Sequence, residues 1–240
     1  DARFFYTQDR KTRLEARIAQ LDTVVYHNKL GTQLKRSMRV QQLAGYIARC
    51  IGADVAHTER AAWLAKADLL SGMVGEFPEL QGIMGGYYAR HDGLSVEVAQ
   101  AIEDHYKPRF AGDALPRNRV GLVVALADKL ETLVGMFGIG NLPSGDKDPF
   151  ALRRHALGVI RMLVEQDLPL GLQALVDAAT PAFGNKITPA TEAARNNLEN
   201  VMGVSFFIVA SIDFLAHLKG VQHQRRQQKT LVGERHTRVD

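Results

Sequence analysis

The stretch from residue 119 to residue 137 constrains the fold most, because it is apolar almost all the way round a helix. Within it, the segment VGLVVALADKL carries a single carboxylate, Asp128. A helix of this kind is buried, and burying an ionised carboxylate alone costs several kcal/mol. Asp128 therefore needs a metal ion, a cationic side chain or hydrogen-bond donors beside it.

Most of the remaining chain also has helical periodicity, with apolar residues three and four positions apart. Capping residues divide it: Thr32 begins one helix and Gly52 ends it, Ser95 precedes another, and Asp148-Pro149 precedes a further one. No segment of strand length alternates with a period of two. We predict an all-α fold with about eight or nine helices.

The chain divides into four parts on this pattern. Residues 1–30 form an opening segment and linker helix, whose first six residues (DARFFY) are strand-like, and residues 31–186 form the helical domain. Residues 187–218 are predicted to be a helical extension, and the basic stretch 219–240 to be a disordered tail. The extension contains the apolar run Val201 to Leu218, which we interpret as a buried helix because a charged Asp interrupts it.

Composition excludes several classes of protein. Hydrophobic residues make up 46% and charged residues 23%, as in an ordinary globular protein, so we expect no membrane partner. One cysteine excludes an internal disulfide and fits a reducing compartment, which predicts a cytoplasmic location. A net charge of +4 permits a nucleic-acid partner. The chain does not begin with Met, and we interpret it as an internal piece of a longer protein.

A second carboxylate, Asp68, lies on an apolar helix face upstream of three closely spaced glycines and an exposed His-Asp-Gly turn. Two acids from separate helices suggest a metal site, which His91 and His105 could complete. The plainer interpretation is that Asp68 and Asp128 bond to backbone amides, Arg or His. The glycines at 82, 85 and 86 indicate either close backbone packing or the approach of a partner.

These acids carry a resemblance to the HD superfamily of helical metal-dependent phosphohydrolases. In that family, a His on an early helix, a His-Asp pair on the next helix and a distant Asp hold a divalent metal. LAKADLLSGM occupies the place of the pair and VALADKLET that of the last Asp. Ala67 replaces the His of the pair, and Arg36 or Ser37 replaces the first His. The resemblance implies an HD-domain-like helical bundle whose acids remain without their histidines, so we expect no metal.

Several longer motifs resemble the β subunit family of the bacterial two-subunit glycyl-tRNA synthetases. They cover residues 1–186 and are FFYTQDRK, NKLGT, KADLLSGMVGEFPELQGIMGGYYARHDG, EDHYKPRFAGDALP, ALADKLETLVGMFGIG and GDKDPFALRRHALGVIRML. The resemblance implies an enzyme that joins glycine to tRNA(Gly) with ATP and Mg. It also implies an α subunit that carries the adenylation site, and a β subunit that handles tRNA, with no cofactor and no catalytic residue on this segment.

Cationic side chains are the candidates for RNA contact, because Lys and Arg bind phosphate. They are Lys107, Arg109, Arg117, Arg153 and Arg154. Two alternatives stay open from the sequence: an HD-type metal-dependent phosphohydrolase, and a purely structural module that docks the α subunit.

Overall fold

A computed structural model describes residues 2–144 and 146–187. Among them, no helix is both long enough and apolar enough to cross a lipid bilayer. The predicted extension beyond Ile187, with its Val201 to Leu218 run, and the predicted tail 219–240 lie outside the described residues.

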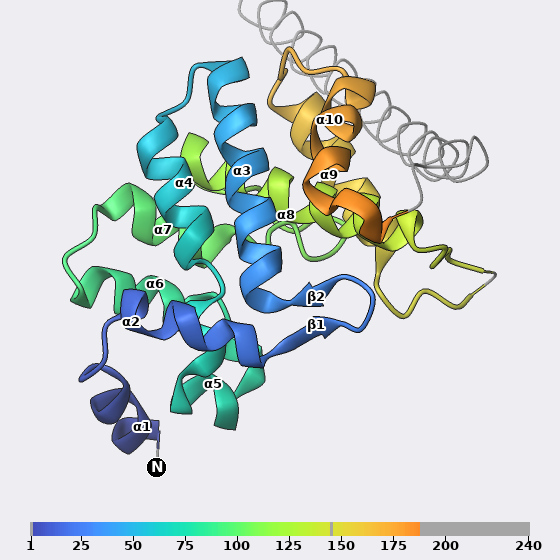
Figure 1. The fold of residues 1–240 in the computed structure, drawn as a ribbon. Coiled ribbons are helices and arrows are strands. Elements are labelled where there is room, and N and C mark those ends of the chain that lie inside the picture. Colours follow the sequence, from blue (N-terminus) through green and yellow to red (C-terminus); the bar gives the residue numbers. More distant parts are fainter. Residues whose placement is uncertain (1, 145, 188–240) are drawn as a thin grey trace, which may run out of the picture.

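The described residues are mostly helical, which confirms the predicted class in this coarser form (Figure 1). The prediction missed a small hairpin of two strands, and the described residues form ten α-helices where about eight or nine were expected. The α-helices are α1 Ala2–Asp9, α2 Leu14–Arg17, α3 Gln33–Ile51, α4 Val55–Leu64, α5 Gly72–Glu76, α6 Ile83–His91, α7 Val96–Asp104, α8 Arg119–Gly138, α9 Leu152–Glu165 and α10 Leu172–Ala179. Short 3-10 helices are η1 Ile18–Thr23, η2 Ala67–Leu70, η3 Pro78–Leu80 and η4 Thr180–Lys186. The antiparallel strands are β1 Val25–His27 and β2 Gly31–Thr32.

Helix α8 forms the centre of the bundle. Every residue from 120 to 137 is buried, because helices α3, α4, α7, α9 and α10 all pack against it (Figure 1). This burial follows from a helix surface that is apolar on nearly every side. It also places the charged residues of α8 in the interior, where each must find a partner.

The predicted helix boundaries at Thr32, Gly52 and Ser95 are confirmed, whereas the one predicted at Asp148-Pro149 lies later in the chain. The Thr32 hydroxyl accepts from the Lys35 amide at the start of α3, and the Ser95 side chain accepts from the Val98 amide at the start of α7. Gly52 ends α3 in the left-handed conformation, with φ of 67°. Helix α9 begins at Leu152, after Ala151, so Asp148 is not its N-cap residue. The Asp148 carboxylate nevertheless accepts from the amides of residues 152 and 153.

The prediction of a strand-like start was wrong, because residues 2–9 form helix α1. Aromatic residues favour strands only weakly, and packing outweighs that preference here. Tyr6 stacks on Tyr88, with ring centroids 6.0 Å apart. Asp9 at the end of α1 accepts from the Gly72 and Met73 amides and from the Tyr88 hydroxyl. These contacts fix α1 against α5 and α6.

Candidate functional site

Asp68 binds backbone amides at the start of helix α6. Its Oδ2 accepts from the Gly82 amide at 2.6 Å and from the Gly85 amide at 3.0 Å, and the residue is fully buried. A Cβ on Gly85 would lie 2.8 Å from Ile102 Cγ2 and 3.2 Å from Asp68 Oδ2. The predicted close packing at these glycines is therefore confirmed, and it lets the carboxylate reach the amides.

Two effects of opposite sign act on the Asp68 carboxyl. Burial disfavours its charged form and raises its pKa to about 6. Hydrogen bonds from the Gly82 and Gly85 amides favour the charged form and so partly offset this rise in the pKa. Asp68 consequently changes charge near neutral pH inside the core.

Asp128 is neutralised by two cations from separate parts of the chain. Arg36 Nη2 on α3 lies 3.0 Å from Asp128 Oδ1, and Lys66 Nζ lies 3.1 Å from the same oxygen. Burial alone would raise the pKa of the Asp128 carboxyl, but Arg36 and Lys66 outweigh it and hold that pKa well below its usual range. Arg36 also donates to Glu131 Oε2 at 3.0 Å and to the Thr132 hydroxyl at 2.8 Å.

Lys66 continues this network to His105. His105 Nδ1 lies 2.6 Å from the Ile102 carbonyl oxygen, so it carries the proton, and Nε2 accepts from Lys66 Nζ at 2.8 Å. Burial, together with the charge of Lys66, lowers the pKa of His105 to about 3, so the imidazole is neutral. The Lys66 ammonium lies 3.9 Å from the centroid of the Tyr106 ring, which covers this cluster.

These residues do not fit a divalent metal. The predicted positions Asp68 and Asp128 are both buried, but backbone amides already engage Asp68 Oδ2 and two cations engage Asp128 Oδ1. His105 reaches Lys66 instead of a metal position, and His91 contacts Asp92 at the far end of α6, roughly 12 Å from its start. Within the described residues, no three His, Cys, Asp or Glu side chains converge as ligands.

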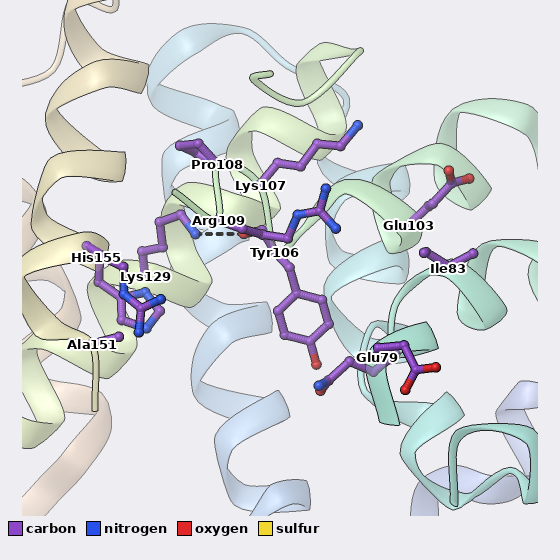
Figure 2. A pocket seen from close by; sticks show the side chains of 12 residues that line it. Glu79, Ile83, Glu103, Tyr106, Lys107, Pro108, Arg109, Lys129, Ala151 and His155 are labelled. Carbon is purple, nitrogen blue, oxygen red and sulfur yellow. Dashed lines mark hydrogen bonds between the residues drawn. The ribbon is translucent and has the colours of Figure 1, made fainter. Parts of the chain in front are cut away.

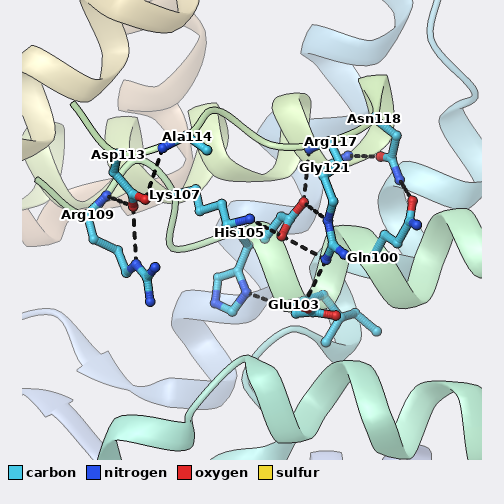
Figure 3. A network of polar contacts seen from close by, with 12 residues as sticks. Gln100, Glu103, His105, Lys107, Arg109, Asp113, Ala114, Arg117, Asn118 and Gly121 are labelled. Atoms are coloured by element: carbon cyan, nitrogen blue, oxygen red, sulfur yellow. Dashed lines mark hydrogen bonds and ion pairs between the residues drawn. The ribbon is translucent and has the colours of Figure 1, made fainter. Parts of the chain in front are cut away.

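Three of the five predicted RNA-contacting cations hold the loop after α7 (Figure 3). Arg117 bonds both oxygens of the buried Asp104 carboxylate, at 2.8 and 2.9 Å, and Lys107 pairs with the same group at 2.9 Å. Arg109 donates from its backbone and its side chain to Asp113. Burial would raise the pKa of the Asp104 carboxyl, yet the bonds from Arg117 and Lys107 lower it.

The other two cations, Arg153 and Arg154, differ from these three. Both are exposed in the first turn of α9, and neither side chain has a hydrogen bond or ion pair with a described residue. Their charges are available to an external anion. The structure thus separates the predicted set into loop-fixing residues and two open guanidinium groups.

A cleft of about 640 Å³ lies between the loop after α7, the start of α9 and the segment before α6 (Figure 2). Three of its lining residues, Lys107, Arg109 and Arg154, belong to the set that the sequence analysis predicted to contact RNA. Sequence reasoning missed Lys129, which also lines it, and Lys66. The signal that could have found both is a charged side chain within an apolar helical segment.

The chain matches the family model described as glycyl-tRNA synthetase beta subunit over residues 1–227. The chain therefore belongs to the glycyl-tRNA synthetase beta subunit family. The match runs beyond residue 186, where we expected the resemblance to end.

Individual relatives agree with the family match. The glycine--tRNA ligase beta subunit of Polaromonas naphthalenivorans is 71% identical over 195 residues, covering 80% of this chain and 27% of the relative. That of Ralstonia nicotianae is 52% identical over 245 residues, covering 100% of this chain and 33% of the relative. The chain thus spans about a third or less of the length of these relatives.

Proposed function

We propose that the chain is a scaffold and tRNA-contacting segment of an enzyme that attaches glycine to tRNA(Gly) with ATP and Mg. In this proposal an α subunit carries the adenylation site, this segment carries no catalytic residue, and the assembly works in the cytoplasm. Family membership supports the overall activity. The observation that carries the scaffold role is the neutralisation of Asp128 by Arg36 and Lys66.

We further propose that the bundle is HD-like and that its metal centre has become a structural ion-pair network. By the resemblance, Arg36 or Ser37 stands at the position of the first histidine and Ala67 at that of the second. The Arg36 guanidinium and the Lys66 ammonium supply the positive charge that a divalent metal would otherwise supply to Asp128. The same exchange disfavours the phosphohydrolase alternative, because the donor set for a catalytic metal is incomplete.

The tRNA contact is proposed for the exposed turn of α9, with Arg153 and Arg154 binding backbone phosphates. Guanidinium groups suit this role because they bind phosphate through two parallel hydrogen bonds. Lys107, Arg109 and Arg117 contribute mainly by holding the neighbouring loop, since Asp104 and Asp113 neutralise them.

The experiment is a tRNA(Gly) titration of the full-length subunit with its α partner at several salt concentrations. The double variant Arg153→Ala/Arg154→Ala should weaken tRNA binding. It should also make the plot of log binding constant against log salt concentration less steep, because up to two fewer counterions are released on binding. Arg10→Ala/Lys11→Ala is the matched control, because it removes two exposed cations just after α1 and should change neither quantity. Equal loss in both double variants would refute a specific α9 contact.

A separate experiment tests the docking alternative. If the segment serves only to dock the α subunit, it should co-purify with α in the absence of tRNA, and tRNA affinity should be unaffected by Arg153→Ala/Arg154→Ala. If α binding survives while tRNA affinity falls, the tRNA contact is supported.

A further inference from the structure

The cleft beside α9 has two chemically different sides (Figure 2). Lys129 and His155 lie together on one side, and Arg154 comes from the same turn of α9 as His155. Glu79 and Glu103 lie on the other side. Glu103 is already paired with Arg90 at 2.8 Å and with Arg117 at 3.0 Å, so Glu79 is the carboxylate there that is open to a ligand. One side is therefore suited to an anion and the other to hydrogen-bond donors.

Lys129 is a buried cation with unused hydrogen-bonding capacity. It is 3% exposed, and its only hydrogen bond to a described residue runs from Nζ to the Tyr106 carbonyl oxygen at 3.1 Å. An ammonium group carries three donors, so two remain. A Cβ on Gly158 of α9 would lie 2.9 Å from Lys129 Cε, so this glycine makes room for the lysine stem beside the cleft.

Two further polar groups on α9 also lack a partner among the described residues. His155 Nδ1 is buried and has no hydrogen-bond partner among the described residues. The Arg154 guanidinium makes no ion pair with a described residue, although it lines the same cleft. A buried polar atom without a partner is costly, and a bound ligand would satisfy it.

We infer that this cleft binds a single nucleoside monophosphate unit, with its phosphate held by Lys129 and Arg154. A phosphate dianion is the group that accepts from an ammonium and a guanidinium together. The cleft volume far exceeds that of a phosphate, and the opposite side, with Glu79, accepts from sugar hydroxyls or base amino groups. The inference rests on the proposed tRNA contact only if an RNA strand supplies the nucleotide.

The test is a calorimetric titration of the full-length subunit with its α partner, using uridine 5′-monophosphate, uridine and inorganic phosphate. A pyrimidine nucleotide keeps the probe distinct from ATP. We expect uridine monophosphate to bind about tenfold or more tightly than uridine, because uridine lacks the charge-assisted bonds. Equal binding of uridine monophosphate and uridine, or no binding of either, would overturn the inference.

Adjacent arginines provide the matched control. Arg154→Gln should weaken uridine monophosphate binding about tenfold, whereas Arg153→Gln, which removes an equally exposed charge outside the cleft lining, should change it less than about twofold. Lys129→Met should weaken binding at least as much, and Arg154→Gln keeps the test decisive if that core variant fails to fold. Equal effects of the two arginine variants would show diffuse charge attraction and reject the site.

A short RNA with and without a 5′-phosphate distinguishes the two sources of the nucleotide. If the RNA end is the ligand, the phosphorylated RNA binds more tightly than uridine monophosphate, and Arg154→Gln removes the difference. If a free nucleotide is the ligand, both RNAs bind more weakly than uridine monophosphate. Arg153→Gln separates the two proposals, because Arg153 belongs to the proposed tRNA contact and lies outside the cleft lining. Unchanged tRNA affinity in this variant would contradict the tRNA contact of Arg153 alone, whereas a loss of uridine monophosphate binding would contradict the cleft site alone.

Discussion

Arg36 Nη2 lies 3.0 Å from Asp128 Oδ1 in the buried contact between α3 and α8. Lys66 approaches the same oxygen from the segment after α4, so one carboxylate joins three parts of the bundle. A buried ion pair adds little net stability relative to apolar packing, but removing one partner leaves an uncompensated charge.

Asp128→Ala should lower the free energy of unfolding by about 3–5 kcal/mol, because it leaves Lys66 and part of the Arg36 charge buried without a partner. Urea denaturation followed by circular dichroism measures this change. Asp54→Ala is the control, because it removes an exposed helix cap of α4 and should cost only about 1 kcal/mol. Similar losses in both variants would argue against the ion-pair network.

Gly85→Ala should destabilise the protein by about 1–3 kcal/mol, although alanine is the better helix former. The added Cβ would lie 2.8 Å from Ile102 Cγ2 and would press on Asp68 Oδ2. Gly75→Ala in α5 provides the comparison, because a Cβ there meets nothing within 4 Å and should be neutral or stabilising. Thermal unfolding of both variants would be compared, and a stabilised Gly85→Ala variant would contradict the close packing.

Asp68 should make stability fall as pH rises through about 6. Its folded-state pKa of about 6 lies above its usual value of 3.8, so its contribution is fully present below about pH 4 and is lost at higher pH. The difference in unfolding free energy between the wild type and Asp68→Asn should therefore shrink between pH 4 and pH 8 by up to about 3 kcal/mol.

The quantity to measure is the difference in unfolding free energy between the wild type and Asp68→Asn. Buried His105 and His155 also make stability depend on pH between about 3 and 6.5, so the wild type alone would not isolate the effect of Asp68. Burial lowers the pKa of each imidazole to about 3, so each makes stability rise with pH up to its usual value near 6.5. Both histidines are present in the wild type and in Asp68→Asn, and their effect cancels. A difference that does not change with pH would contradict the shifted pKa of Asp68.

Arg117→Ala should cost about 1–3 kcal/mol, because the buried Asp104 carboxylate loses two side-chain hydrogen bonds and keeps only Lys107 and a backbone donor. Arg153→Ala should change stability by less than about 0.5 kcal/mol, because its side chain has no described partner. Guanidinium chloride denaturation compares the two. Equal stability of both variants would mean that Arg117 does not hold the loop.

Much of the fold could be predicted from local patterns. The apolar surface of residues 119–137 predicted a buried central helix, and Thr32, Gly52 and Ser95 predicted helix boundaries that the structure confirms. The start of the chain could not be predicted in this way. The aromatic segment DARFFY forms a helix because Tyr6 and Asp9 find partners on α5 and α6, which are distant in sequence.

The apolar residues around Asp68 and Asp128 were enough to predict that both acids are buried and need partners. The long motifs along the chain were enough to predict the family. The identity of the partners of these acids depends on the packing of the folded chain. Arg36, Lys66 and the Gly82 and Gly85 amides reach them from separate segments, and contacts between distant segments are fixed by helix packing, which no local pattern encodes.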